Sequence, residues 1–498
     1  MELDFEKLTQ KLSDLDKMAD GLDGLLKDLR VEIHDILWDL IELKKEKVEK
    51  RENETVNKEK LFDVAIIGAG PAGLIAAHEL QDKSIVVTEK GAPIPKRVCP
   101  MVTECVGCNR CGEIEGIGGA GGWSDGKLCL GPVGILDQFL GEHYPDEIQA
   151  INRIFREVLQ EKYVEPNDCV DTCQLGDALT QEITEVANLG TSTIRYAFQH
   201  MSEGIRSSGS TLIANDRVVQ VSDDYKHVFT VKTKSGREFH ARNVIVATGK
   251  CDFTLVPQLI ERYTLKTIPT EPTLGFRLAI PNEELQKMKS FGNNPKLKLH
   301  LPNRDTVKTH CFAFGGEVMA YVCGNYFLVG GRADYQNPTQ FANTNILYKF
   351  SSEDPKERKE MVHTTLASIK ADYPRNVIYQ DLPSFFDPSR KPQETNVPAC
   401  RGGKLGNLLP YYPPYVVEAM REFIYNMANA YEMDMSKATI FGPAAEWLND
   451  AVAASMEMET AKKGLYIVGD GAGITQGIMA AAVTGYRAAH SIRGKSNA

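Results

Sequence analysis

A glycine turn between an apolar run and a helical pattern constrains this chain more than any other feature. Residues 62–67 have the character of a short buried strand, residues 68–73 spell Gly-Ala-Gly-Pro-Ala-Gly, and residues 74–80 continue with helical spacing. In such a turn the first glycine allows the tight bend, the second lets a pyrophosphate approach the backbone, and the third lets helix and strand pack closely. The segment therefore predicts a strand–turn–helix unit that binds a dinucleotide at the helix N-terminus.

A carboxylate follows the next strand at the position that such a unit requires. Residues 85–88 form a second apolar run, which ends at Glu89, about 20 residues beyond the first glycine. A carboxylate there would bind the ribose hydroxyls of the dinucleotide. The residues expected to contact the cofactor in this part of the chain are Gly68, Gly70, Ala72, Gly73, Glu89, Lys90 and Arg97.

Three later segments decide which dinucleotide is expected. Residues 464–468 form a strand followed by Gly469-Asp470-Gly471 and an alanine-rich helix, residues 243–249 end in Ala-Thr-Gly, and residues 211–219 form a strand-like run. In this order they resemble the glutathione-reductase-like FAD-binding superfamily. The resemblance implies bound FAD, with a helix N-terminus facing the flavin ring. It implies further FAD contacts at Val219, Thr248, Gly249, Asp470, Gly477 and Ile478.

A second glycine-rich segment at residues 116–121 has the same glycine spacing, but no apolar strand precedes it, so we do not expect a second nucleotide-binding fold there. With residues 122–128 it resembles the GxGGAGxxSDGKL signature of a largely uncharacterised family of FAD-dependent dehydrogenases. Residues 311–318 are similar to a Cys-x-Cys-Pro-Gly-Gly stretch of that family, but Ala313 and Phe314 replace its second cysteine and its proline. Residues 442–450 also depart from the family pattern, which weakens any transfer of substrate class.

Four of the 11 cysteines lie close together in the sequence, at Cys99, Cys105, Cys108 and Cys111. Cys-x-x-Cys spacing lets thiolates converge on one metal ion. Three interpretations stay open: an iron–sulfur cluster that relays electrons to a flavin, a zinc ion that holds a loop, and free thiols without a metal.

Flavin performs its own electron chemistry, so the protein need only position a substrate or move a proton. Lys127 and Gln476 lie in segments expected near the flavin ring, where they would hydrogen-bond the ring or polarise a substrate. His310 is a candidate for proton transfer and Arg332 for binding an anion. For each of these four candidate catalytic residues, a solvated charge or a structural hydrogen bond is the alternative interpretation.

The first 60 residues differ from the rest of the chain. They carry 17 acidic and 12 basic side chains, and their apolar residues recur in alternating steps of four and three. This pattern predicts a coiled coil that would join copies of the chain into a homo-oligomer. A single amphipathic helix packed on the chain's own body is the alternative.

The composition restricts the class of protein and its partners. A formal charge of −10 argues against broad nucleic-acid binding, where a basic face is expected. The sequence contains no apolar run long enough for a transmembrane helix, and its first residues do not resemble a signal peptide. We therefore expect a cytoplasmic protein with reduced thiols and no membrane contact. Its expected partners are a small-molecule substrate and, as electron donor, NAD(P)H or an electron-transfer protein.

Together these features predict an α/β fold, with a Rossmann-like FAD-binding domain assembled from discontinuous segments, an inserted α+β substrate domain and an N-terminal helical extension. The expected bounds are 1–60 for the extension, 61–130, 191–255 and 455–498 for the FAD-binding domain, and 131–190 and 256–454 for the substrate domain. The predicted activity is hydride transfer between the flavin and a small organic substrate. The alternatives are an FAD-dependent lyase or amine oxidase that cleaves a C–N bond, and a non-catalytic scaffold that carries a flavin.

Overall fold

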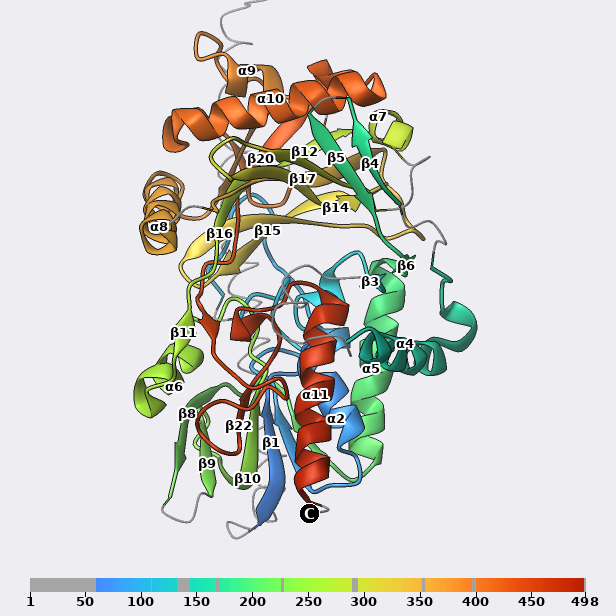
Figure 1. The fold of residues 1–498 in the computed structure, drawn as a ribbon, viewed down its shortest axis with the longest axis vertical. Coiled ribbons are helices and arrows are strands. Elements are labelled where there is room, and N and C mark those ends of the chain that lie inside the picture. The colour runs from blue at the N-terminus through green and yellow to red at the C-terminus, as the bar shows by residue number, and fades with distance from the viewer. Residues whose placement is uncertain are drawn as a thin grey trace, which may run out of the picture. The chain divides into compact units, whose positions relative to one another are not determined.

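The computed structural model describes residues 60–496, except 109, 132–143, 167–170, 177, 225–227, 289–293, 352–353, 396 and 398–399. The coiled coil predicted for residues 1–60 therefore lies outside the described residues and stays a prediction. Residues 61–498 form one unit, which contains a seven-stranded and a nine-stranded sheet (Figure 1). The domain bounds expected from the sequence also stay predictions.

The seven-stranded sheet takes its strands from three separate stretches of the chain. β1 pairs in parallel with β2 and β10, β2 pairs in parallel with β7, and β10 pairs in parallel with β22. Parallel strands buried on both faces are expected to be continuous apolar runs, as the sequence indicates. The predicted α/β fold with a Rossmann-like unit is confirmed. The strands are β1 (Leu61–Ile67), β2 (Ile85–Thr88), β7 (Thr211–Ile213), β8 (Val218–Asp223), β9 (Phe229–Thr233), β10 (Glu238–Val246) and β22 (Leu465–Ile467).

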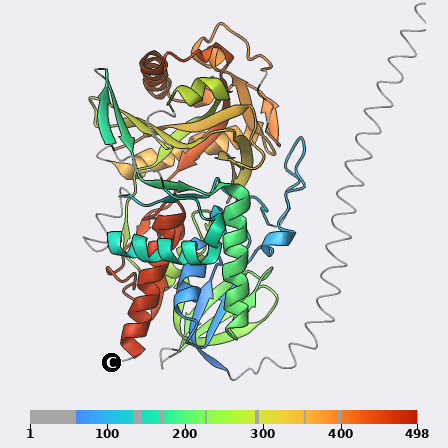
Figure 2. The same ribbon diagram turned by 90° about the vertical axis from the view of Figure 1, so that its right-hand side faces the viewer.

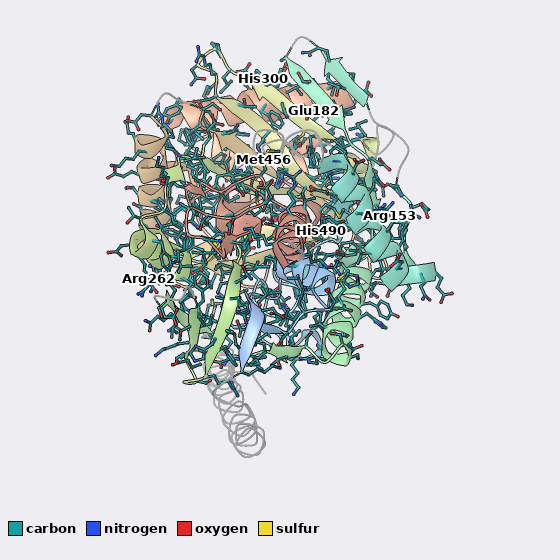
Figure 3. The ribbon with its side chains drawn as sticks, turned by 60° about the horizontal axis from the view of Figure 1, so that its bottom comes forward. Arg153, Glu182, Arg262, His300, Met456 and His490 are labelled. Atoms are coloured by element: carbon teal, nitrogen blue, oxygen red, sulfur yellow. A yellow bond between two sulfur atoms is a disulfide. The ribbon has the colours of Figure 1, made fainter. Side chains whose placement is uncertain are left out.

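Four helices pack together beside this sheet: α2 (Pro71–Glu79), α4 (Tyr144–Leu159), α5 (Gly190–Ser207) and α11 (Ile478–Ser496). Figure 2 shows α5 and α4 from the side, and Figure 3 labels Arg153 of α4 and His490 of α11. α2 and α11 approach closely, because a Cβ at Gly485 would lie 2.1 Å from the carbonyl oxygen of Ala72. This contact joins the C-terminal helix to the helix of the glycine turn.

The nine-stranded sheet carries the second large hydrophobic core. Its strands pair antiparallel except β18 and β19, which are parallel, and helix α10 (Pro414–Tyr431) packs on it. The sequence predicts a helix over residues 416–431, and α10 confirms it. In sheet order the strands are β19 (Gly403–Leu405), β18 (Val377–Asp381), β20 (Thr439–Glu446), β12 (Thr273–Pro281), β17 (Phe341–Lys349), β14 (Thr306–Ala313), β13 (Lys296–His300), β5 (Leu179–Ile183) and β4 (Asp171–Leu175).

Shorter elements complete the unit. The remaining helices are α6 (Leu255–Tyr263), α7 (Asn282–Gln286), α8 (Pro355–Asp372) and α9 (Leu382–Phe386). Two-stranded sheets are formed by β3 (Lys127–Cys129) with β6 (Val186–Asn188), by β11 (Thr267–Ile268) with β21 (Ala451–Val452), and by β15 (Glu317–Cys323) with β16 (Tyr326–Arg332). Among the described residues, no helix is both long and apolar enough to cross a membrane.

One covalent link was not expected. A disulfide joins Cys251, in the loop after β10, to Cys323 at the end of β15, with a Cα–Cα distance of 4.8 Å. The prediction of reduced thiols is therefore wrong for this pair. Spacing could not reveal it, because the two residues are 72 positions apart.

Candidate functional site

The glycine turn has the conformation that its sequence predicts. Gly68 has a φ of +106°, and a Cβ at Gly73 would lie only 1.9 Å from the carbonyl oxygen of Gly68. Gly70 is the N-cap residue of α2, and no side chain caps that helix. The helix dipole therefore gives the start of α2 a positive partial charge without a protein side chain to satisfy it.

A cavity of about 570 Å³ lies against this turn. Its lining includes residues 216–218, residues 247–255 and the Asp470 carboxylate. Gly73 lies behind the turn, and Gly477 and Ile478 at the start of α11 do not line this cavity. The cofactor-binding residues predicted from the sequence that do line it are Gly68, Gly70, Ala72, Glu89, Lys90, Thr248, Gly249 and Asp470.

Glu89 lines the cavity but is also bonded to three backbone N–H groups. One carboxylate oxygen accepts from Ala69 at 2.9 Å, and the other accepts from Gly91 at 2.8 Å and from Gly116 at 3.0 Å. The side chain is only 6% exposed. Glu89 thus ties the glycine turn to the second glycine-rich segment, a role that the sequence does not reveal.

We expect Glu89→Gln to lower the free energy of unfolding by about 2 kcal/mol even without a cofactor. The amide nitrogen of glutamine cannot accept the N–H bonds that a carboxylate oxygen accepts, and a bond to a charged acceptor contributes about 1.5–3 kcal/mol. Urea unfolding of the flavin-free protein measures the loss. Glu79→Gln is the control, since Glu79 contacts His490 and Arg493 at the surface. Equal stability of the Glu89→Gln variant and the wild type would contradict this role.

The second glycine-rich segment lies directly on the first. The N–H of Gly118 donates to the carbonyl of Ala69 at 2.8 Å, and a Cβ at Gly119 would lie 3.0 Å from the Cα of Gly70. Residues 116 and 119–121 line the cavity. The sequence shows no apolar strand before this segment, and among the described residues no strand lies between β2 and β3. It did not show that the segment forms part of the cavity wall.

Arg97 is placed differently from its prediction. Its guanidinium donates to the carbonyls of Gly112, Glu113, Ile117 and Gly119, and the side chain does not line the 570 Å³ cavity. Burial lowers its pKa to about 10. Arg97 therefore holds the loop of residues 112–119, and its position gives no support to direct contact with a cofactor.

Val219 is also placed differently. The run of residues 211–219 is two strands, β7 and β8, joined by a turn in which Asn215 has a positive φ. Val218 lines the cavity, whereas Val219 is 43% exposed and does not line it. Successive side chains of a strand point to opposite faces, so a one-residue difference in position reverses the contact.

The predicted metal site is not supported. Cys108 and Cys111 line the cavity, whereas Cys105 is buried in a small hydrophobic cluster with Met101 and Cys400, and Cys99 packs against that cluster. No three His, Cys, Asp or Glu side chains within the described ranges are placed to hold a metal ion. The metal-ligand assignment of these four cysteines therefore stays a prediction, as does the alternative of free thiols without a metal.

Lys127 and Arg332, two of the four predicted catalytic residues, are held by other protein groups. Lys127 is buried, lies 3.1 Å from a carboxylate oxygen of Asp125 and donates to the carbonyl of Phe312. Arg332 pairs with Glu317 at 2.6 Å and with Glu113 at 3.1 Å, beside a separate cavity of about 350 Å³. Their positions favour the alternative interpretation, that of structural ion pairs.

The other two candidates lie close to the same carboxylate. Gln476 lines a small cavity together with Glu446, and His310 lies 3.0 Å from Glu446, measured from Nδ1 to Oε1. The other ring nitrogen of His310 lies 3.9 Å from the sulfur of Cys311. The sequence did not predict Glu446 as a partner, because nothing in its local pattern connects it with residue 310. The adjacency of His310 and Cys311 was the only visible signal.

Two further ionisable groups lie near the wall shared by these cavities. Burial raises the pKa of Asp470 to about 6, although Thr475 donates to its carboxylate at 2.7 Å. Lys250 lines both the large and the small cavity. Burial would lower its pKa, but the nearby Tyr321, Glu446 and Asp470 outweigh burial and raise it. Lys250, Glu446 and Asp470 therefore place a cation and two carboxylates together in the lining of the small cavity.

Comparison with known proteins agrees with the geometry of the turn. Residues 62–271 match the model of the pyridine nucleotide-disulphide oxidoreductase family. The match supports the FAD/NAD(P)-binding oxidoreductase superfamily. A protein of Clostridium beijerinckii is 23% identical over 488 residues, which cover 86% of this chain and 80% of that protein. The finer family indicated by the GxGGAGxxSDGKL signature is not confirmed.

The solved structures to which the chain shows similarity share little sequence with it. Glycine oxidase from Geobacillus kaustophilus is 12% identical, with 87% of this chain and 95% of that chain covered and a TM-score of 0.40. Aklavinone-11 hydroxylase with FAD and aklavinone is 12% identical, with 89% and 64% covered and a TM-score of 0.43. A flavoprotein/dehydrogenase from Cytophaga hutchinsonii is 15% identical, with 87% and 79% covered and a TM-score of 0.38.

Proposed function

We propose that the chain is an FAD-dependent oxidoreductase that transfers a hydride between the flavin and a small organic substrate. The observation that carries the proposal is the 570 Å³ cavity built on the glycine turn, with the uncapped start of α2, Glu89 and Asp470 in its lining. The match of residues 62–271 to the pyridine nucleotide-disulphide oxidoreductase family supports the same cofactor class.

The residues present fit FAD. A Cβ at Gly70 would have only the Cα of Gly119 within 4 Å, at 3.8 Å, so the backbone there is open to a pyrophosphate. The start of α2 would face the pyrophosphate, Glu89 the ribose and Asp470 the ribityl chain. Bound flavin supplies a ring that accepts or returns a hydride. The protein supplies the cradle and a buried polar wall that would orient the substrate.

We propose NAD(P)H or an electron-transfer protein as the electron donor. Among the described residues, only 61–79 join a GxGxxG turn to a preceding strand and a following helix, so NAD(P)H would have no nucleotide-binding domain of its own there. An electron-transfer protein is the other donor class. Anaerobic mixing with NADH, NADPH or candidate amines, followed at the flavin absorbance bands, separates hydride transfer from redox-neutral C–N cleavage. A flavin that no donor reduces would instead favour the non-catalytic scaffold.

We expect Gly70→Ala to weaken FAD binding at least about tenfold while leaving the fold intact, a change of about 1.4 kcal/mol. The new methyl group meets no protein atom closer than 3.8 Å, and Gly70 has a φ of −78°, which alanine adopts without strain. The methyl group would, however, occupy the space through which the pyrophosphate approaches. Fluorescence titration of the flavin-free protein with FAD measures the effect.

Gly494→Ala is the matched control, because a Cβ at Gly494 has no atom within 4 Å and lies near the end of α11. This variant should bind FAD as the wild type does. Wild-type protein that purifies without FAD and does not bind it on titration would refute the proposed function. Unchanged affinity in the Gly70→Ala variant would refute the placement of the pyrophosphate.

A further inference from the structure

A break in the regular pairing of β14 brings two reactive side chains together. The register between β14 and β17 shifts between His310 and Ala313, and Cys311 has a φ of +56°. In a regular strand, neighbouring side chains point to opposite faces, so His310 and Cys311 would be separated. The bulge removes that separation and leaves Nε2 of His310 3.9 Å from Sγ of Cys311. A non-glycine residue with a positive φ is strained, and such strain is often found at functional sites.

Glu446 of β20 fixes the imidazole from the opposite side. Its Oε1 lies 3.0 Å from Nδ1 of His310, and the glutamate is 6% exposed. The other oxygen, Oε2, is buried and has no hydrogen-bond partner among the described residues. With Nδ1 held by the carboxylate, Nε2 is directed at the sulfur. A thiol, an imidazole and a carboxylate thus stand in the order that activates a nucleophile.

The charges around the cluster favour the ionised pair. Burial would raise the pKa of the Cys311 thiol, but the positive charge and hydrogen bond of His310 outweigh burial and lower the pKa to about 7. Burial would likewise lower the pKa of His310, but Cys311 and Glu446 raise it to about 9. Near pH 7 a substantial fraction of the pair is therefore a thiolate beside an imidazolium.

Other charged groups face this pair from neighbouring elements. Asp125 lies in the loop before β3, and Lys127 is the first residue of β3. Asp125 raises the pKa of the Cys311 thiol, whereas Lys127 lowers it. Arg277 of β12 donates to the carbonyl of Cys311 at 3.0 Å and to Asn343 at 2.6 Å, and so holds the bulge. His310 lowers the pKa of Glu446 most, and Lys250 and Lys308 lower it further.

The pair remains open to a small molecule. The His310 side chain is 22% exposed although it lies deep in the protein, and Cys311 is only partly buried. A purely structural thiol in a hydrophobic core would lack this access, as Cys400 does. The site therefore combines a nucleophile and an acid, and both side chains are partly exposed.

We propose that Cys311, His310 and Glu446 form a nucleophilic thiol site that captures an aldehyde. In the proposed step the Cys311 sulfur attacks the carbonyl carbon and forms the S–C bond. The π electrons of the C=O bond move to the oxygen, which takes the proton from Nε2 of His310. The product is a thiohemiacetal, with no change in total oxidation state. Cys311 and His310 are the catalytic residues, and Glu446 is a positioning residue.

An aldehyde matches the groups present, because its addition needs one nucleophile and one proton, and the pair holds both. An ester or amide would also require a leaving group to be protonated and a water to be activated. The proposed capture needs no electron acceptor. It therefore goes beyond the proposed hydride transfer and can succeed or fail independently of FAD binding.

The test labels the thiols of the purified protein with iodoacetamide and follows each cysteine by peptide mass spectrometry. In the wild type, the labelling rate of Cys311 should rise with a midpoint near pH 7. Cys99 is the internal reference in the same digest, because burial raises its pKa to about 12. His310→Gln should move the Cys311 midpoint towards pH 9 and slow labelling at pH 7.5 more than about tenfold, as the thiolate fraction falls.

His240→Gln is the matched control, since His240 also lies near a glutamate, 3.7 Å from Glu238, but on β10. It should leave the Cys311 profile unchanged. Glu446→Gln should raise the midpoint of Cys311 labelling by less than His310→Gln does. Glu446→Asp keeps a carboxylate, so its midpoint should lie closer to that of the wild type. Circular dichroism verifies that each variant is folded.

Acetaldehyde is the probe for the ligand, and acetamide is its control. Acetaldehyde should slow the labelling of Cys311 reversibly in the wild type, and this protection should be lost in His310→Gln. Labelling of Cys311 no faster than that of Cys99, or a midpoint that His310→Gln does not move, would overturn the activated thiol. Normal pH dependence without protection by acetaldehyde would overturn the aldehyde assignment. Labelling is carried out on the protein with and without FAD. Because the thiol site is proposed to act without FAD, a failure to bind FAD would not change the result expected for Cys311.

Discussion

Gly73→Ala is expected to destabilise the unit of residues 61–498 by at least about 3 kcal/mol and to abolish FAD retention. The alanine Cβ would lie 1.9 Å from the carbonyl oxygen of Gly68, far inside van der Waals contact. Overpacking a rigid site costs about 1–3 kcal/mol and sometimes more. Here the atom in the way is backbone, so a rotamer change cannot relieve the clash.

The backbone of Gly68 cannot retreat freely, because a Cβ placed on it would already be 2.3 Å from the carbonyl oxygen of Ala247. The turn is therefore held between α2 and the end of β10. Movement of either would open the cavity wall formed by residues 247–249. Urea unfolding of the flavin-free protein measures the loss of stability, and the flavin absorbance of the purified variant measures retention.

Gly204→Ala is the control for a helical glycine. Gly204 lies in α5, and a Cβ at this position would have no atom within 4 Å. Because alanine has a higher helix propensity than glycine, Gly204→Ala should raise the free energy of unfolding by about 0.5–1 kcal/mol. If Gly73→Ala instead matched the wild type in stability and FAD content, the close approach of α2 to the turn would be refuted.

The parts of the fold that the sequence predicted are those decided by local pattern. The strand–turn–helix of residues 61–79 follows from its short apolar run and its glycine spacing. Local pattern was insufficient at Val219, which does not line the cavity. A turn at Asn215 breaks one apparent strand into two, and the residue facing the cavity becomes Val218.

The surroundings of the four clustered cysteines and of Arg97 depend on contacts between distant segments. Cys-x-x-Cys spacing indicates convergence on a metal, but burial of Cys105 beside Met101 and Cys400 draws that sulfur into an apolar cluster. An arginine side chain commonly binds anions. The guanidinium of Arg97 instead donates hydrogen bonds to backbone carbonyls of residues 112–119. Local spacing contains no information on which of these competing partners a side chain meets.

The candidate thiol site shows the same limit. His310 and Cys311 are adjacent in sequence, but a regular strand would separate them, and only the bulge in β14 brings them together. Glu446 reaches His310 from β20, which is separated from β14 in the sheet by β12 and β17. Such a cluster is a property of the assembled sheet, and the sequence identified one of its three members as a candidate.

Reduction of the Cys251–Cys323 disulfide is expected to lower the free energy of unfolding by about 4 kcal/mol. The link closes a loop of 72 residues, and the chain-entropy model gives a stabilisation of this size for such a loop. It also ties the loop after β10, where Cys251 lines the cavity, to the end of β15. A reducing agent should therefore lower the melting temperature and loosen FAD together.

The Cys251→Ser/Cys323→Ser double variant should start at the lower melting temperature and show no response to tris(2-carboxyethyl)phosphine. Cys173→Ser is the control for a free thiol, and it should keep the full response of the wild type. Wild-type protein that melts identically with and without the reductant would show that the link does not hold the two segments. If the predicted cytoplasmic location is correct, the pair would face a reducing environment, where disulfides are rare. Stability and cofactor retention would then depend on the redox state of this single pair.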